Sequence, residues 1–257
     1  MSNSISSTTS GVGVAVSVVV PAFNEAERLP STLNKIVDFL AARPYSYEVI
    51  VVDDGSTDAT ASIVEKIYQQ SGTVRLIKNP GNRGKGYAVR NGMLHAAGQY
   101  LVFSDSDLST PIEDIDLLLS PLQKGYDVVI GSRALRPDWI YPRQPLSRQL
   151  VGRVFNYCVR GVTFLAIQDT QCGFKGFRRD AAQAIFSRQR LTGFGFDVEL
   201  AYLARKYGFR LLEVPVHWSN DLATKVHPFR DGPRMFLDLL RIRWNDWSGQ
   251  YKDTLST

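Results

Sequence analysis

Short apolar runs alternate with longer amphipathic segments through the first half of the chain. The runs are rich in Val and Ile and lack a polar residue at every second position, which is typical of strands buried on both faces. Between them, apolar residues recur at helical spacing, as Leu33, Ile36 and Leu40 do. This pattern predicts one α/β domain with a Rossmann-like, mostly parallel central sheet flanked by helices. The predicted strands cover residues 14–23, 47–56, 74–80, 100–105 and 127–133, and the predicted helices cover 25–43, 58–70, 86–97 and 112–125, the second helix being capped by Ser56 or Thr57.

Polar residues gather where the predicted strands end. Each one alone could be an ordinary turn residue. In parallel sheets, however, ligands bind beyond the carboxyl ends of the strands, so polar groups at several ends predict a shared binding edge. The polar residues in these places are Asn24, Glu25, Asp53, Asp54, Lys85, Asp105, Asp107, Ser132 and Arg133.

Asp105 and Asp107 stand one residue apart directly after the apolar run "YLVF". Two carboxylates at this spacing repel each other unless a cation lies between them, and hard oxygen ligands suit Mg²⁺ or Mn²⁺. A solvated acidic turn is the alternative. Nearby, the segment "NPGNRGKG" combines glycines that let backbone amides approach an anion with the charge of Lys85. Its glycine spacing matches neither a Walker loop nor a dinucleotide-binding fingerprint.

Charge is unevenly distributed along the 257 residues. Residues 1–130 hold 10 Lys and Arg against 14 Asp and Glu, whereas residues 131–257 hold 20 against 11, which gives the net charge of +5. A basic second half predicts an anionic partner, such as a phosphate or a membrane surface. Nucleic acid is not expected, because the chain has no helix-turn-helix, RNP or zinc-finger pattern.

The remaining sequence features concern location. The start, "MSNSISSTTSG", is polar and lacks the pattern of a signal peptide, so we expect residues 1–14 to be a disordered tail. No apolar run is long enough to predict a transmembrane helix. Cys158 and Cys172 are too few for a disulfide framework and are expected to be free thiols in a reducing compartment. A cytoplasmic location is the prediction.

Several motifs resemble family 2 glycosyltransferases with the GT-A fold. In the first half these are "VVVPAFNEAERL", "EVIVVDDGSTDAT", "NRGKGYAVRNGM" and "FSDSDLSTP". In the second half, "DTQCGFKGF", "GFGFDVEL" and "VPVHWS…TKVHPF" resemble dolichyl-phosphate β-glucosyltransferases and bacterial polyprenyl-phosphate glycosyltransferases. The resemblance runs from about Val16 to Trp244. It implies a GT-A domain over residues 15–257, divided into a nucleotide-binding half (15–130), an acceptor-binding half (131–232) and a C-terminal amphipathic helix (233–250).

The resemblance also implies a reaction: inverting transfer of a sugar, glucose from UDP-glucose being the first choice, to a polyprenyl or dolichyl phosphate. The alternatives are GDP-mannose as donor, another lipid or a soluble acceptor, and a catalytically silent protein that binds sugar nucleotides or a membrane surface. By position, Asp105 and Asp107 would hold Mg²⁺ or Mn²⁺. The nucleotide-sugar site would be lined by Pro21, Phe23, Asn24, Glu25, Asp54, Lys85, Asp105, Ser106 and Asp107.

The resemblance assigns catalytic roles to Asp107 and to Asp197, which would orient the donor sugar or act as a mild base. A phosphate monoester is largely ionised at neutral pH, so the acceptor needs cations for positioning more than it needs a strong base. Arginines suit this role through bidentate contacts. The candidates are Arg133, Arg148 and Arg153, the last two having a solvated helix face as the alternative. Asp169, Gln171 and Lys175 would lie on the acceptor side or brace the site, with a capped turn as the alternative, and Cys172 is expected to be a packing residue.

Two segments, 147–166 and 233–247, combine an apolar stripe with arginines, and the second adds tryptophans. The apolar stripe of the first contains Leu150, Val151, Val154, Phe155, Cys158, Val159 and Val162. Basic residues beside Trp and Leu favour a helix that lies in a membrane interface. The prediction is peripheral contact with the cytoplasmic face of a membrane. The alternative is that both helices pack on the sheet.

Overall fold

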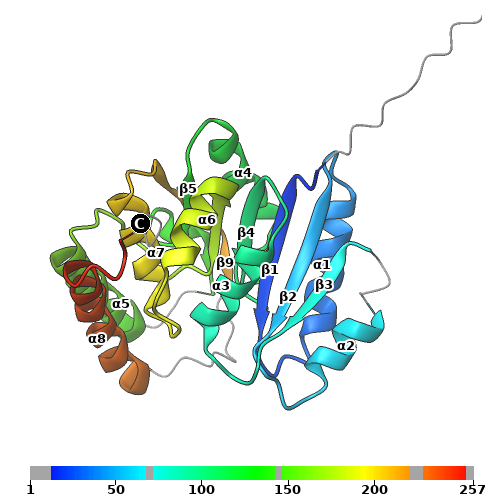
Figure 1. Ribbon diagram of the computed structural model, residues 1–257, viewed down its shortest axis with the longest axis horizontal. Coiled ribbons are helices and arrows are strands. Elements are labelled where there is room, and N and C mark those ends of the chain that lie inside the picture. Colours follow the sequence, from blue (N-terminus) through cyan, green and yellow to red (C-terminus); the bar gives the residue numbers. More distant parts are fainter. Residues whose placement is uncertain (1–12, 68–71, 143–145, 220–227, 253–257) are drawn as a thin grey trace, which may run out of the picture.

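The computed structural model describes residues 13–67, 72–142, 146–219 and 228–252. At its centre is a seven-stranded sheet in the order β3-β2-β1-β4-β7-β5-β8 (Figure 1). Neighbouring strands are parallel except at β7, which is antiparallel to both β4 and β5, so the expected mostly parallel sheet is confirmed. The strands are β1 (Val16–Ala22), β2 (Tyr47–Asp53), β3 (Val74–Lys78), β4 (Tyr100–Ser104), β5 (Val128–Ser132), β7 (Phe174–Arg178) and β8 (Leu211–Pro215).

Helices cover both faces of the sheet (Figure 1). They are α1 (Leu29–Ala41), α2 (Thr60–Ile67), α3 (Lys85–His95), α4 (Ile115–Gln123), α5 (Leu146–Thr163), α6 (Arg179–Arg188), α7 (Phe196–Lys206) and α8 (Pro228–Trp247). Two 3₁₀ turns, η2 (Ile112–Asp114) and η3 (Pro137–Trp139), and a small parallel sheet of β6 (Ile140–Tyr141) and β9 (Trp218–Ser219) complete the described elements.

The pleat of the central strands divides the core into two clusters. Val18 and Val20 of β1 belong to the cluster that packs against α1 and α4, whereas Val19 belongs to the cluster that packs against α3, α6 and α7. All three are fully buried. Because successive side chains point to opposite faces, a strand covered on both sides must be apolar at nearly every position. This explains the continuous apolar runs in the sequence, each buried Val contributing about 1.5–3 kcal/mol.

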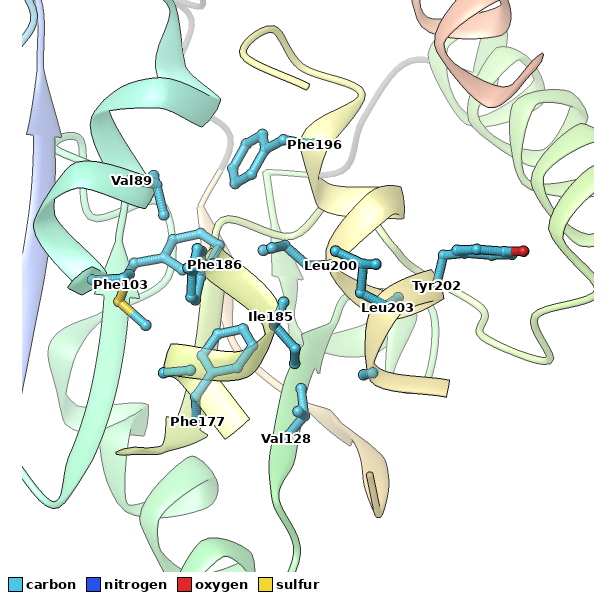
Figure 2. Packing of buried hydrophobic residues seen from close by; sticks show 14 of the residues in the cluster. Val89, Phe103, Val128, Phe177, Ile185, Phe186, Phe196, Leu200, Tyr202 and Leu203 are labelled. Atoms are coloured by element: carbon cyan, nitrogen blue, oxygen red, sulfur yellow. The ribbon is translucent and has the colours of Figure 1, made fainter. Parts of the chain in front are cut away.

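Phenylalanines from β4, β7, α6 and α7 pack together in one of the two core clusters (Figure 2). The ring of Phe103, in β4, lies 5.9 Å from that of Phe196, the first residue of α7, measured between centroids. The Phe103 ring also stacks on Phe177 of β7, whose ring meets Phe186 of α6 edge-on. These contacts fix the start of α7 against the end of β4. They therefore hold Asp197, the second residue of α7, near the residues that follow β4.

One expectation about local structure needs correction, and a second is met in part. Neither Ser56 nor Thr57 caps α2: Asp58 Oδ1 accepts a hydrogen bond from the backbone N–H of Thr60, at 2.9 Å, and one from its hydroxyl. The segment "DTQCGFK" begins with the capped turn that was one interpretation, since Asp169 Oδ1 accepts the backbone N–H of Gln171 at 3.1 Å, and it then runs into strand β7, which separates β4 from β5. Residues 1–12 of the predicted tail lie outside the described residues.

Candidate active site at the carboxyl edge of the sheet

Because β7 is antiparallel to its two neighbours, it begins at the edge of the sheet where they end. The parallel strands β1, β2, β4 and β5 end at this edge, and β7 begins there, with Phe174 paired to Ser104. Residues that precede β7 therefore lie beside residues that follow β4. Gly173 shows how close they are: a Cβ atom added to it would lie 2.5 Å from Oδ1 of Asp105 and nearer still to Oδ2. Only glycine leaves room for this carboxylate.

The loop after β1 is tied to the loop after β2 around Asn24. The backbone N–H of Asn24 donates to the hydroxyl of Ser56 at 2.9 Å, and its side-chain oxygen accepts from the N–H of Thr57 at 2.8 Å. The N–H of Glu25 donates to the hydroxyl of Thr60, also at 2.8 Å. Asn24 has a φ of 52°, a left-handed conformation that asparagine tolerates better than most residues. The predicted nucleotide-binding loop is thus held in one shape.

Three other predicted residues lie around this loop. Pro21 is inside β1 and buried, opposite Val52 of β2, while Phe23 is half-buried just beyond the strand. The carboxylate of Glu25 is buried and forms an ion pair with Arg28. Pro21 and Glu25 thus make contacts within the protein, and the contact of all three residues with a nucleotide stays a prediction.

Asp54 shapes the glycine-rich loop before α3. Its carboxylate accepts hydrogen bonds from the Asn79 side chain at 2.7 Å and from the backbone N–H groups of Arg83 and Gly84 at 3.1 and 2.8 Å. Motif comparison identified Asp54 as a nucleoside ligand and did not anticipate Asn79 or Arg83. In the structure, Asp54 holds the loop that places Lys85 at the start of α3.

Lys85 lies against the first of the two aspartates. Its Nζ is 2.7 Å from Oδ1 of Asp105, out of line for a hydrogen bond, so this buried oxygen has an ion-pair contact but no hydrogen bond. Burial would lower the pKa of Lys85, but the carboxylates of Asp105 and Asp197 outweigh it and raise the pKa above its ordinary value. Burial, and then the charge of Asp105, raise the pKa of Asp107. The edge therefore concentrates negative charge.

The loop that carries the two aspartates is held by hydrogen bonds to its backbone. Oδ1 of Asp107 accepts the N–H of Ser109 at 2.9 Å, and Leu108 between them has a φ of 46°. The carbonyl oxygen of Ser106 accepts the hydroxyl of Thr32 from α1 at 2.7 Å. Ser106 thus anchors the loop through its main chain, and its predicted contact with the donor remains a prediction.

The residues present fit a divalent cation brought in by a ligand. Within the described ranges, no group of three or more His, Cys, Asp or Glu side chains is placed to hold a metal ion alone. Asp105 and Asp107 nevertheless offer hard oxygen ligands, and Oδ1 of Asp105 accepts no hydrogen bond. A cation at these carboxylates would need further oxygen ligands from elsewhere, and a diphosphate would provide them.

On the far side of β7, Arg133 follows β5 and binds Asp169 as a fork. Its Nε and Nη2 donate to the two carboxylate oxygens at 2.6 and 2.8 Å, and its backbone N–H donates at 3.0 Å. Burial would raise the pKa of Asp169, but the charge of Arg133 holds it below its ordinary value. Asp169 also accepts the N–H of Gln171, and the guanidinium lies over the ring of Trp218.

This fork bears on the predicted acceptor residues. Two donors of Arg133 are already engaged with Asp169, so an acceptor phosphate would have to use the others. Arg148 and Arg153 belong to α5, but their side chains lie outside the described residues, and their roles stay predictions. Cys172, next to this fork, is buried, and burial raises the pKa of its thiol to about 11, as expected of a packing residue.

Asp197 lies in the first turn of α7 and is almost fully buried. Its Oδ1 forms an ion pair with Nζ of Lys175, which projects from β7. Burial raises the pKa of Asp197 above its ordinary value, although Lys175 and then Lys85 oppose the rise. The sequence identified both residues but not their contact, because nothing in "DTQCGFK" indicates a strand running toward α7.

Helices α5 and α8 pack side by side at one end of the molecule (Figure 1). Val159 of α5 and Leu239 and Ile242 of α8 are buried in the core, as the alternative of packing on the fold required. Outside this seam, however, both helices also expose large apolar side chains. We call the exposed apolar residues of this region the α5–α8 surface; within the described chain they are Val154, Tyr157, Phe164, Phe236, Leu237, Leu240, Trp244 and Trp247.

Comparison with known proteins decides the family. Residues 17–186 match the model of "Glycosyl transferase family 2", which spans more than half of the chain. The chain belongs to glycosyl transferase family 2. The resemblance seen in the motifs is thereby confirmed.

Among curated proteins, the chain is similar to several named dolichyl-phosphate beta-glucosyltransferase. It is 36% identical to that of Dictyostelium discoideum, with 93% of this chain and 77% of that protein covered. It is 41% identical to that of Drosophila melanogaster (88% and 74%) and 35% identical to that of Homo sapiens (92% and 77%).

The fold has close counterparts among solved structures. Glucosyl-3-phosphoglycerate synthase from Mycobacterium tuberculosis, in complex with Mn²⁺, UDP and glucosyl-3-phosphoglycerate, superposes with a TM-score of 0.65 at 21% identity. The superposition covers 90% of this chain and 79% of that one. The same enzyme with Mn²⁺, UDP and phosphoglyceric acid gives a TM-score of 0.66 at 20% identity, covering 94% and 80%. At these identities the likeness shows the fold, a GT-A glycosyltransferase domain.

Proposed function

We propose that this family 2 glycosyltransferase transfers glucose from UDP-glucose to a polyprenyl phosphate of the dolichyl type, with inversion at the anomeric carbon. The observation that carries the proposal is the meeting of Asp105, Asp107, Lys85 and Asp197 at one edge of the sheet. It is supported by the relatives named dolichyl-phosphate beta-glucosyltransferase, which match along nearly the whole chain. UDP as the leaving group is in keeping with the UDP complexes of the structural neighbour.

In this reaction, a phosphate oxygen of the acceptor attacks the anomeric carbon while the bond to the diphosphate breaks. The products are UDP and the polyprenyl phosphate that now carries glucose. Asp105 and Asp107 would hold Mg²⁺ or Mn²⁺, which as a Lewis acid stabilises charge on the departing diphosphate. Lys85, whose pKa is raised, carries a full positive charge at neutral pH and can move from Asp105 to the diphosphate.

The acceptor phosphate brings its own nucleophilic charge, since its second pKa is near 6. The protein therefore has to align it more than deprotonate it. Arg133 supports this role because it stands at the same edge as Asp105, on the opposite side of β7. Asp197 would hold a hydroxyl of the donor sugar, so that the anomeric carbon faces the incoming phosphate.

A transfer assay with radiolabelled donors tests the proposal. Wild-type protein is incubated with UDP-glucose or GDP-mannose, a short polyprenyl phosphate, and Mg²⁺, Mn²⁺ or EDTA, and the lipid phase is counted. We expect label in the lipid phase with UDP-glucose and a divalent cation, and at least ~100-fold less with Asp107→Ala. Label from GDP-mannose alone would reassign the donor. The absence of any lipid-soluble product would refute the acceptor.

We also propose that the α5–α8 surface rests on the membrane that holds the acceptor. Within the described ranges, no helix has the length and apolar character that a bilayer crossing needs. Exposed apolar side chains instead gather on two adjoining helices, with Trp244 and Trp247 exposed by 62% and 80%. Exposed arginines of these helices, among them Arg160, Arg234 and Arg241, match anionic lipid headgroups. The cytoplasmic face stays a prediction.

Vesicle flotation measures this contact independently of catalysis. Wild-type protein is mixed either with vesicles of neutral lipid or with vesicles that also contain about 30% anionic lipid. We expect the Trp244→Ser/Trp247→Ser variant to lose most of its binding to anionic vesicles. Tyr141→Ser, which removes an exposed aromatic ring outside the two helices, serves as the matched control. Equal flotation of all three proteins would refute the contact.

A further inference from the structure

Lys175 is a lysine with no access to solvent. Its side chain is 0% exposed, although it lies next to the candidate active site. Lysine is almost never fully buried without a partner, because removal of an ammonium group from water is costly. Its contacts are therefore expected to offset the cost of burying the ammonium group. The ammonium donates to the backbone oxygen of Cys172, forms the ion pair with Asp197, and lies 5.2 Å from the centre of the Phe103 ring.

The contact with Asp197 involves only one of the two carboxylate oxygens. Lys175 binds Oδ1. Within the described part of the chain, Oδ2 of Asp197 makes no hydrogen bond or ion pair. It is also not one of the fully buried side-chain oxygens that lack a partner, so it is not completely enclosed by protein. An ionised carboxylate accepts hydrogen bonds at both oxygens. Oδ2 is therefore the atom with which Asp197 can receive a ligand.

Other charged groups act on Asp197 from the neighbouring elements. Lys85 at the start of α3 favours the ionised carboxylate, whereas Asp105 after β4 disfavours it. Lys85 is itself in contact with Asp105 and would be drawn to an arriving diphosphate. Lys175 is the cation in direct contact, and it is enclosed by protein. Its hold on Asp197 would not change when a donor binds.

We propose that Lys175 is a positioning residue, which fixes Asp197 in its ionised form through Oδ1 and thereby presents Oδ2 to the donor sugar. This inference deepens the proposed function and rests on it. Lys175 touches no substrate in this account and acts through Asp197. The antiparallel strand β7 makes this possible, since it delivers Lys175 from the acceptor side of the sheet to the first turn of α7.

The competing explanation is that Lys175 serves only the stability of the fold. Lys175→Met would then lower activity equally at every pH, because less protein would be folded. The positioning role predicts a different pattern. Without the adjacent cation, the buried carboxylate of Asp197 takes up a proton more readily, so its pKa should rise further. The loss of activity should then be greatest at low pH and partly recovered at high pH.

Two measurements on purified, full-length protein test the inference. The first is a carbon-13 NMR titration of the aspartate carboxyl groups, with Asp197 assigned by its loss in Asp197→Asn. We expect Asp197 to titrate at higher pH in Lys175→Met than in the wild type. The second is kcat as a function of pH with UDP-glucose and short polyprenyl phosphate. We expect a loss of ~100-fold at pH 7, with the acid limb of the profile shifted upward and KM for the donor little changed.

A double variant keeps the test decisive if Lys175→Met alone does not fold. Lys175→Met/Asp197→Asn removes both charges, and replacement of a whole buried pair is often tolerated. Its kcat should equal that of Asp197→Asn within a factor of about 2. The control is Lys206→Met, which removes the cation paired with Asp246 away from this edge and should leave the kcat profile unchanged.

Each outcome has one meaning. If wild-type protein shows no transfer with UDP-glucose, the proposed function fails, and the NMR titration still reports whether Lys175 controls Asp197. An Asp197 titration unchanged by Lys175→Met would overturn the inference, as would a kcat loss uniform across pH. A double variant at least ~10-fold less active than Asp197→Asn would also overturn it, because Lys175 would then act by another route.

Discussion

Gly173→Ala gives a sharp test of the candidate site, because it adds one methyl group beside Asp105. The backbone of Gly173 is not in the left-handed region, so alanine is allowed there without strain. The new Cβ, however, would lie 2.5 Å from Oδ1 of Asp105 and closer to Oδ2, whereas an ordinary contact is at least 3.4 Å. The carboxylate, which is the ion-pair partner of Lys85, must therefore move by about 1 Å.

A displacement of about 1 Å in a catalytic group can lower the rate by ~100-fold, which corresponds to about 2.7 kcal/mol of transition-state stabilisation. We expect this loss in kcat/KM for UDP-glucose, measured in the transfer assay at saturating Mn²⁺, with little change in the thermal midpoint. Gly161→Ala in α5 is the control, since nothing lies within 4 Å of its added Cβ. Activity of Gly173→Ala within threefold of the wild type, with the fold intact, would refute the placement of Asp105.

Other predictions concern the surroundings of this site. The raised thiol pKa of Cys172, about 11, predicts that iodoacetamide at pH 8 leaves it unmodified in folded protein and alkylates it after unfolding, as mass spectrometry can show. The lowered pKa of Asp169 means that its bond to Arg133 stabilises the fold above the unfolded pKa of about 4 and loses this effect as the pH falls toward the folded pKa. Asp169→Asn should therefore lower the free energy of unfolding by about 3 kcal/mol at pH 7 in urea titrations, and the difference from wild type should shrink below pH 4; a pH-independent difference would contradict the assignment. Asp58→Ala removes the hydrogen bonds to Thr60 at the start of α2 and should cost about 1 kcal/mol in the same titration, whereas Ser56→Ala should cost α2 nothing through capping.

The sheet could be predicted because its strands carry an unmistakable physical requirement. β1, β2, β4 and β5 are covered on both faces, so the chain must be apolar at nearly every position, and such runs stand out in a sequence. The candidate binding edge followed from the same reasoning, since parallel strands end together. Asp105 and Asp107 were predicted to hold a cation because two carboxylates at that spacing repel each other unless a cation lies between them, and this role stays a prediction.

The strand β7 could not be predicted in the same way. Its residues "FKGFR" include a lysine and an arginine, and the burial of Lys175 depends on Asp197, which follows it by 22 positions in the chain. Long-range ion pairs of this kind leave no periodic pattern. The close approach of Gly173 to Asp105 and the use of Asp54 to hold the loop at Gly84 are likewise consequences of packing. A motif can identify such residues but does not give their contacts.

The anomeric configuration of the product tests the central claim most directly. UDP-glucose carries an α-linked glucose, and a direct displacement by the acceptor phosphate inverts that carbon. Proton NMR of the lipid phase, after reaction of the wild-type protein with UDP-glucose and a short polyprenyl phosphate, should show a β-linked glucosyl phosphate that is absent with Asp107→Ala. An α-linked product would contradict the direct displacement, and the absence of a glucosyl lipid would contradict the reaction itself.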